Sequence, residues 1–143
     1  MAKTPKQPAE TPVTEIFGPL PIGLTRATDF TLSAYTNQAV SLVDLLRARM
    51  VDGQAVIRNV AFTNCHIEGP GVVLVLGCHF EMSDFGNPAG DIRNLILRPA
   101  SQTSVVGAIP VDGCTFTRCQ FVGLGYTGTD QFLDQIIALG TPR

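Results

Sequence analysis

The segment Cys114-Thr-Phe116-Thr-Arg-Cys119-Gln-Phe121-Val-Gly decides the expected fold. Apolar side chains alternate with polar ones, which is the period of a β-strand, so the cysteines and phenylalanines are expected to point inward. The same pattern occurs at 60–67 and at 78–85, and rows of 18 residues place these segments in common columns. The columns are Val60/Cys78/Ile96/Cys114, Phe62/Phe80/Arg98/Phe116, Cys65/Ser83/Ser101/Cys119 and Ile67/Phe85/Thr103/Phe121.

A short repeat that keeps bulky and small columns in register is typical of stacked coils. The sequence therefore predicts an all-β solenoid, namely a short right-handed parallel β-helix of about four 18-residue coils with flanking N- and C-terminal helices. A left-handed helix of hexapeptides also takes 18 residues per coil. It requires an aliphatic residue at every sixth position, and this chain does not have that pattern.

Four parts of the chain can be distinguished. They are a disordered, Pro-rich tail at 1–15, an N-terminal strand and capping helix at 16–53, the β-helix at 54–128, and a C-terminal helix and tail at 129–143. The first helix is expected to cover about 12 residues after an N-cap at Thr36 or Asn37. The second is expected to begin at Asp130 with Thr129 as its N-cap.

Composition excludes several classes of protein. The chain has 143 residues, 45% of them hydrophobic and 15% charged, with a net charge of -2. Nucleic acids and anionic membranes attract basic patches, so we expect neither as a partner. No apolar run approaches the roughly 18 residues that span a bilayer, and residues 1–14 have no apolar stretch typical of a secretory signal.

The four cysteines are predicted to be reduced and buried. In successive coils about 4.8 Å apart, Cys78 and Cys114 are separated by two coils and Cys65 and Cys119 by three, which is too far for a disulfide. A bond between Cys114 and Cys119, which share a coil, stays open on this reasoning. Reduced thiols indicate a cytoplasmic protein.

Two tetrapeptides, Cys65-His66-Ile67-Glu68 and Cys78-His79-Phe80-Glu81, contain residue types that bind zinc. Neighbouring residues of a strand point to opposite faces, so one site cannot easily use both the cysteine and the histidine. We therefore predict no metal and no cofactor.

Two further columns fall on the outer face of the predicted coils. They are His66/Asp84/Gln102/Gln120 and Thr63/Glu81/Pro99/Thr117. The candidate ligand-binding residues are His66, Glu81 and Asp84. Glycoside hydrolysis needs a pair of carboxylates on one face, and the first column offers a single aspartate, so no catalytic residue is predicted.

The segment 114–123 resembles two tandem pentapeptide repeats. In that family a central Phe or Leu, and a small residue two positions before it, point into a right-handed, four-sided helix. Phe62 and Ile67, like Phe80 and Phe85, have the same spacing. A pentapeptide coil is longer than the 18-residue period here, so the coil closes differently. The architecture with its polar tail is also similar to that of the bactofilins, bacterial proteins that polymerise through a β-helical core. Neither family is enzymatic.

The predicted function is a structural or protein–protein interaction module without catalysis, which binds itself as a homo-oligomer or binds another protein. End coils of a β-helix expose unpaired backbone groups. The apolar residues of the last helix are expected to pack on a neighbouring subunit or on the terminal coil; they are Phe132, Leu133, Ile136 and Ile137. The alternative is a carbohydrate-binding or carbohydrate-active β-helix that uses the outer polar ladder. The absence of Trp and the presence of only two Tyr favour the interaction module.

Overall fold

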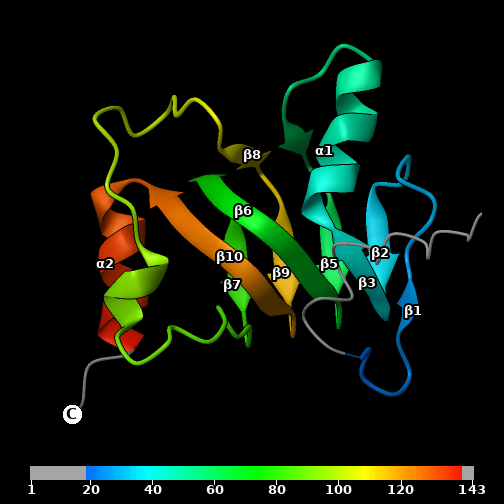
Figure 1. Ribbon diagram of the computed structural model, residues 1–143. Helices are drawn as coiled ribbons and strands as arrows, with labels where there is room; N and C mark the ends of the chain where they lie inside the picture. Colours follow the sequence, from blue (N-terminus) through cyan, green and yellow to red (C-terminus); the bar gives the residue numbers. More distant parts are fainter. Residues whose placement is uncertain (1–18, 140–143) are drawn as a thin grey trace, which may run out of the picture.

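The computed structural model describes residues 19–139, which form two sheets and two helices (Figure 1). The strands are β1 (Thr25–Arg26), β2 (Ala34–Thr36), β3 (Gln38–Ser41), β4 (Ile57–Arg58), β5 (Ala61–Thr63), β6 (His66–Leu76), β7 (His79–Glu81), β8 (Ile109–Asp112), β9 (Thr115–Thr117) and β10 (Gln120–Gly128). The helices are α1 (Leu42–Val51), α2 (Asp130–Leu139) and the 3-10 helix η2 (Ile92–Leu95). None of the helices within residues 19–139 is long and apolar enough to cross a membrane.

Every strand pairing among these residues is parallel. One sheet has the order β1-β3-β6-β8-β4, with β10 also paired to β6, and the other has the order β2-β5-β9-β7. Figure 1 shows the long strands β6 and β10 in front of the short strands β5, β9 and β7, with α2 beyond β10 at one end. The core lies between the two sheets.

The chain does not place successive segments next to each other. β9 lies between β5 and β7, so residues 109–128 are inserted between the segment 57–76 and the segment 78–85. The predicted all-β solenoid of successive coils is therefore wrong. The fold is a mixed α/β arrangement of two parallel sheets and two helices.

One of the predicted coils, the one that contains residues 96–103, does not form strands in the structure. Its members Ile96, Arg98, Ser101 and Thr103 lie outside the strands, in and after the segment that contains η2. Arg98 occupies the column in which the other rows have phenylalanine, and a guanidinium cannot be buried there without a partner. Ile96 keeps a single bridge to Tyr126.

The 18-residue register nevertheless survives in the cross-strand pairs. Phe62 pairs with Phe116, and Phe116 pairs with Phe80, at sequence separations that are multiples of the repeat. Their rings stack with centroid distances of 4.9 and 5.0 Å, and Tyr35 adds a fourth ring 5.7 Å from Phe62. The predicted column of phenylalanines is therefore confirmed, in an order that the repeat alone does not fix.

The residue that follows each strand of the β2-β5-β9-β7 sheet has a left-handed backbone. Asn37, Asn64, Met82 and Arg118 have φ values of 56, 51, 49 and 51° at equivalent positions. Asparagine tolerates this conformation better than most residues. The Asn64 side-chain amide also donates to Asn37 Oδ1 (2.6 Å), which ties two of these turns together.

The predicted start of the second helix is confirmed, whereas the predicted start of the first helix is wrong. α1 begins four or five residues later than expected, because residues 38–41 form β3 and Ser41 is the N-cap that accepts a hydrogen bond from the Asp44 N–H (3.3 Å). α2 begins at Asp130 as predicted, and Thr129 Oγ1 accepts from the Phe132 N–H (3.2 Å). The predicted tail at 1–15 and residues 140–143 of the predicted C-terminal tail lie outside the described residues.

Candidate functional site

A polar row crosses the outer face of the sheet that contains β6. Arg26, Ala39, His66, Gln120 and Asp84 lie side by side on neighbouring strands or bridges. The row forms because Ile67 points into the core, which directs its neighbours His66 and Glu68 to the outer face. The structure thus brings together His66, Gln120 and Asp84 from one predicted outer column, whereas Gln102 lies elsewhere.

The most buried charge of this face is Glu68, whose exposed fraction is 0%. Its Oε1 accepts from Arg26 Nη1 (3.0 Å), and its Oε2 lies 3.1 Å from His66 Nδ1. A buried carboxylate is very costly unless it is paired and hydrogen-bonded, and here both oxygens have partners. Ala39, small and buried between Arg26 and His66 in the row, leaves room for the guanidinium.

The geometry limits the chemistry that this cluster can perform. An ionised carboxylate can only accept, so His66 donates its Nδ1–H to Glu68. A histidine oriented in this way serves as a base in many active sites. Within residues 19–139, however, no hydroxyl or thiol forms a hydrogen bond with His66. The cluster ties β1 to β6.

Two hollows of about 350 and 440 Å³ border the other end of the row. Both are lined by Asp84 and Gln120. Arg118 adds a cation to the first hollow, and backbone of Gly86 and Gly123 lines the second. These hollows are open and mixed in polarity, and a ligand-binding role for His66 and Asp84 stays a prediction.

The third candidate, Glu81, lies in the other sheet. It is exposed at the end of the row Thr36–Thr63–Thr117–Glu81. This row contains the members of the second predicted outer column except Pro99. The turn at Met82 separates Glu81 from Asp84, so the two carboxylates belong to different sheets.

The cysteines lie in two pairs on neighbouring strands. His66 is in register with Gln120, which places Cys65 beside Cys119, and His79 is in register with Thr115, which places Cys78 beside Cys114. The expectation that these pairs are two or three coils apart is therefore wrong, because insertion of residues 109–128 brings them together. All four thiols are free.

The thiols act as hydrogen-bond donors to the strand beside them. Ser83 occupies the same column as Cys65 and Cys119 and makes the same contact. The bonds run from Cys65 to the Tyr35 carbonyl (3.3 Å), from Cys119 to Phe62 (3.5 Å), from Ser83 to Phe116 (3.1 Å), from Cys78 to Val111 (3.3 Å) and from Cys114 to Ile57 (3.4 Å). The adjacent Cys65 thiol and burial raise the pKa of Cys119, which keeps this side chain protonated and able to donate.

This role can be tested at Cys119. We expect Cys119→Ser to lower the free energy of unfolding by about 1 kcal/mol or less, because a hydroxyl makes the same bond. We expect Cys119→Ala to cost about 2 kcal/mol, since the Phe62 carbonyl then loses the thiol donor and a small cavity forms. Urea denaturation of both variants measures the difference, and a serine variant less stable than the alanine variant would contradict the role.

The two Cys-His-apolar-Glu segments do not form a common site. Cys65 points into the core while His66 contacts Glu68, and His79 is exposed on β7. Within residues 19–139, no group of three His, Cys, Asp or Glu side chains is placed to hold a metal ion.

Helix α2 covers one end of the core, and the predicted oligomerisation residues fall on both sides of it. Leu133 and Ile136 are buried within the chain, whereas Phe132 is half-buried with its ring 5.5 Å from that of Phe80. Of the two predicted partners for this helix, a neighbouring subunit or the end of the same chain, Leu133 and Ile136 use the end of the same chain. Ile137 is half-buried.

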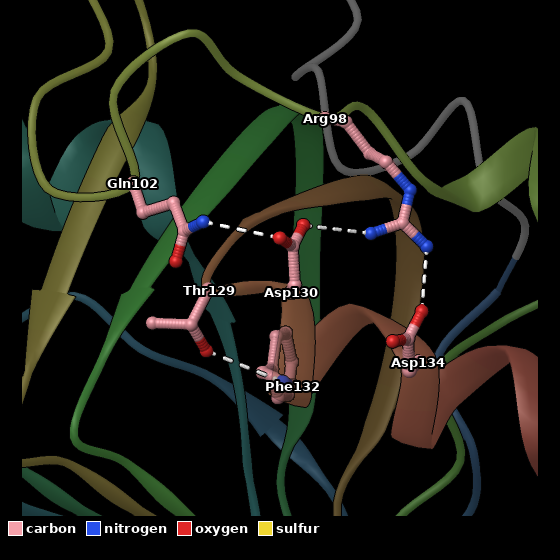
Figure 2. Close-up of polar contacts among 6 residues, drawn as sticks. All are labelled: Arg98, Gln102, Thr129, Asp130, Phe132 and Asp134. Carbon is pink, nitrogen blue, oxygen red and sulfur yellow. Dashed lines mark hydrogen bonds and ion pairs between the residues drawn. The ribbon is translucent and has the colours of Figure 1, made fainter.

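A polar clamp holds the start of α2, as Figure 2 shows. Arg98 donates to Asp130 (2.9 Å) and to Asp134 (2.7 Å), and Gln102 donates to the other oxygen of Asp130 (3.2 Å). These exposed contacts join the loop after η2 to the helix. Arg98, which does not fit the phenylalanine column, has its partners here.

Between α2 and β7 lies a mostly apolar groove of about 320 Å³. Phe80, Phe85 and Phe132 form its floor and are half-buried, and Leu139 at its rim is 66% exposed. The opposite end of the aromatic stack is closed, because Tyr35 is only 1% exposed and its hydroxyl donates to the Asp29 carbonyl (2.8 Å).

The comparisons with known proteins assign no relatives to this chain. No protein-family model matches it, and neither a curated protein nor a solved structure is significantly similar to it.

Proposed function

We propose that this chain is a structural, protein–protein interaction module that self-associates through the end formed by β7 and α2. The observation that supports this is the difference between the two ends of the aromatic stack. Tyr35 closes one end, whereas Phe80, Phe85 and Phe132 remain half-exposed around the groove at the other. Covering this apolar surface with a second subunit removes it from water, which favours association.

A carbohydrate-binding role has less support. Glycan binding generally uses exposed aromatic rings, and both tyrosines are buried. His66 of the outer ladder is bonded to Glu68, which is in turn bonded to Arg26, so this cluster is occupied by contacts within the chain. The outer ladder therefore favours a structural role over recognition of a sugar.

The four free thiols support a cytoplasmic location as part of the proposal. Cysteines that lie in register on neighbouring strands and stay unlinked are typical of proteins kept in a reducing compartment.

Self-association is tested by sedimentation velocity of the full chain over a range of concentrations up to about 200 µM, because a weak oligomer forms only by mass action. We expect a reversible shift to a larger species. Leu139→Asp should weaken it, since a carboxylate then replaces an apolar side chain at the rim of the groove. Val106→Asp is the matched control, because Val106 is 101% exposed in a loop outside the groove. A strictly monomeric chain would contradict the proposal.

A further inference from the structure

We propose that Cys78 is a site of reversible covalent modification by a low-molecular-weight disulfide, and that Cys114 resolves the mixed disulfide into an internal Cys78–Cys114 bond. The two cysteines would then respond to the redox state of their surroundings. The bond joins the inserted segment 109–128 to the segment 78–85, two parts of the fold that meet only through non-local contacts. This response is independent of self-association.

Cys78 and Cys114 lie at the same level of neighbouring strands. His79 is in register with Thr115, and the His79 N–H donates to the Cys114 carbonyl (3.0 Å). Neighbouring strands are about 4.8 Å apart, which is within the Cα separation of about 4.4–6.8 Å that a disulfide spans. The Cys78 thiol already points to the segment that carries Cys114, because it donates to the Val111 carbonyl (3.3 Å). The bond can therefore form by rotation of the side chains, with the strands in place.

The two cysteine pairs differ in their access to solvent. Cys114 is fully buried, but Cys78 is only half-buried. Cys78 lines the groove beside β7 and a second hollow of about 520 Å³ that is also lined by residues of α2. Cys65 and Cys119 have the same relative register and also border a hollow, yet their exposed fractions are only 2 and 1%. Cys78 is thus the thiol that a small molecule reaches first.

The exchange takes two steps. The Cys78 thiol releases its proton to water, and its thiolate attacks one sulfur of the small disulfide and displaces a thiolate, which leaves a mixed disulfide on Cys78. The Cys114 thiol loses its proton in turn, attacks the Cys78 sulfur and displaces the second small thiolate. The two cysteines lose two electrons and two protons together, and the small disulfide is reduced to two thiols.

The internal bond would change the stability of the chain. It closes a loop that contains residues 79–113, including η2 and Arg98. Closing a long loop reduces the conformational freedom of the unfolded chain. We therefore expect the oxidised chain to unfold at a higher urea concentration than the reduced chain.

Oxidised glutathione tests both steps in the full, folded chain. The neighbouring Cys114 thiol and burial raise the pKa of Cys78, so the reaction is followed at about pH 8.5, where more thiolate forms. After alkylation of the remaining thiols, mass spectrometry should show a Cys78–Cys114 cross-link that dithiothreitol reverses. Cys114→Ser should stop with one glutathione on Cys78. Cys78→Ser should react at least about 10-fold more slowly, because exchange requires access to the attacking thiol.

Cys65→Ser is the matched control, since Cys65 belongs to the pair that has the same register but is closed to solvent, and it should react like the unchanged chain. A folded chain that keeps all four thiols, a cross-link between Cys65 and Cys119, or a Cys114→Ser variant without glutathione on Cys78 would overturn the proposal. Cys114→Ala, which should give the same mixed disulfide, replaces Cys114→Ser if circular dichroism shows that the serine variant is unfolded.

Discussion

Replacement of Phe116 by alanine is expected to lower the free energy of unfolding by about 3–5 kcal/mol, the range for a fully buried aromatic residue. Phe116 is 1% exposed and lies between Phe62 and Phe80, with ring centroids 4.9 and 5.0 Å away. Its strand, β9, is also the one that joins β5 to β7. A cavity at this position therefore separates the two parts of the core that flank the inserted segment.

Phe80→Ala provides the internal comparison. Phe80 belongs to the same stack but is half-buried beside the groove. Its ring therefore contributes less burial free energy to the folded state than the ring of Phe116. We expect its loss of stability to be clearly smaller than that of Phe116→Ala. Urea denaturation followed by far-ultraviolet circular dichroism measures both, and equal effects would show that the end of the stack is not open in solution.

The second large effect is expected at Glu68. Glu68→Ala removes the carboxylate that contacts both Arg26 and His66, and loss of one partner from a buried ion pair costs about 3–5 kcal/mol. Glu68→Gln should cost less, because the amide oxygen still accepts a hydrogen bond from Arg26. Both are expected to remain folded at moderate temperature.

Asp84→Asn is the control for Glu68, since Asp84 is exposed in the same polar row. An exposed carboxylate contributes little, so its stability should change by roughly 0.5 kcal/mol or less. Thermal melts of the three variants give the ranking. A Glu68→Ala protein as stable as Asp84→Asn would mean that the buried cluster is open to water in solution.

Much of the local structure could be predicted from the strand pattern in the sequence. The alternation around Phe116 correctly indicates that cysteine and phenylalanine point inward, and the columns correctly pair Phe62, Phe80 and Phe116. Thr129 correctly marks the start of α2. These features depend on short-range periodicity and capping, which neighbouring residues determine.

The order of the strands could not be obtained in the same way. A repeat defines which residues are at the same level, but any permutation of the rows keeps that register, so Phe116 fits equally well beside Phe62 or beyond Phe80. The exception at Arg98 was a usable signal, since a charged residue in an aromatic column argues against a fourth coil. The longer strand pairing of β10 with β6 decides the order, and it depends on contacts far apart in the chain.

The buried cluster of Arg26, His66 and Glu68 could be predicted only in part from the sequence. His66 and Glu68 are two residues apart, so strand alternation puts them on one face, which the sequence could have indicated. Arg26 comes from a two-residue strand, and no local pattern brings it to Glu68. The position of β7 at the end of its sheet likewise depends on the strand order and not on the residues of β7.

The insertion of residues 109–128 has a consequence for biosynthesis. β4 pairs with β8 and β7 pairs with β9, so both of these edge strands wait for partners that are synthesised later. Until then the nascent chain holds two unmatched parts of one core, and folding must be completed after translation of the C-terminal segment rather than coil by coil. Such non-local pairing slows folding and exposes strand edges meanwhile, so this chain is expected to depend more on chaperones than a sequential repeat protein of equal length.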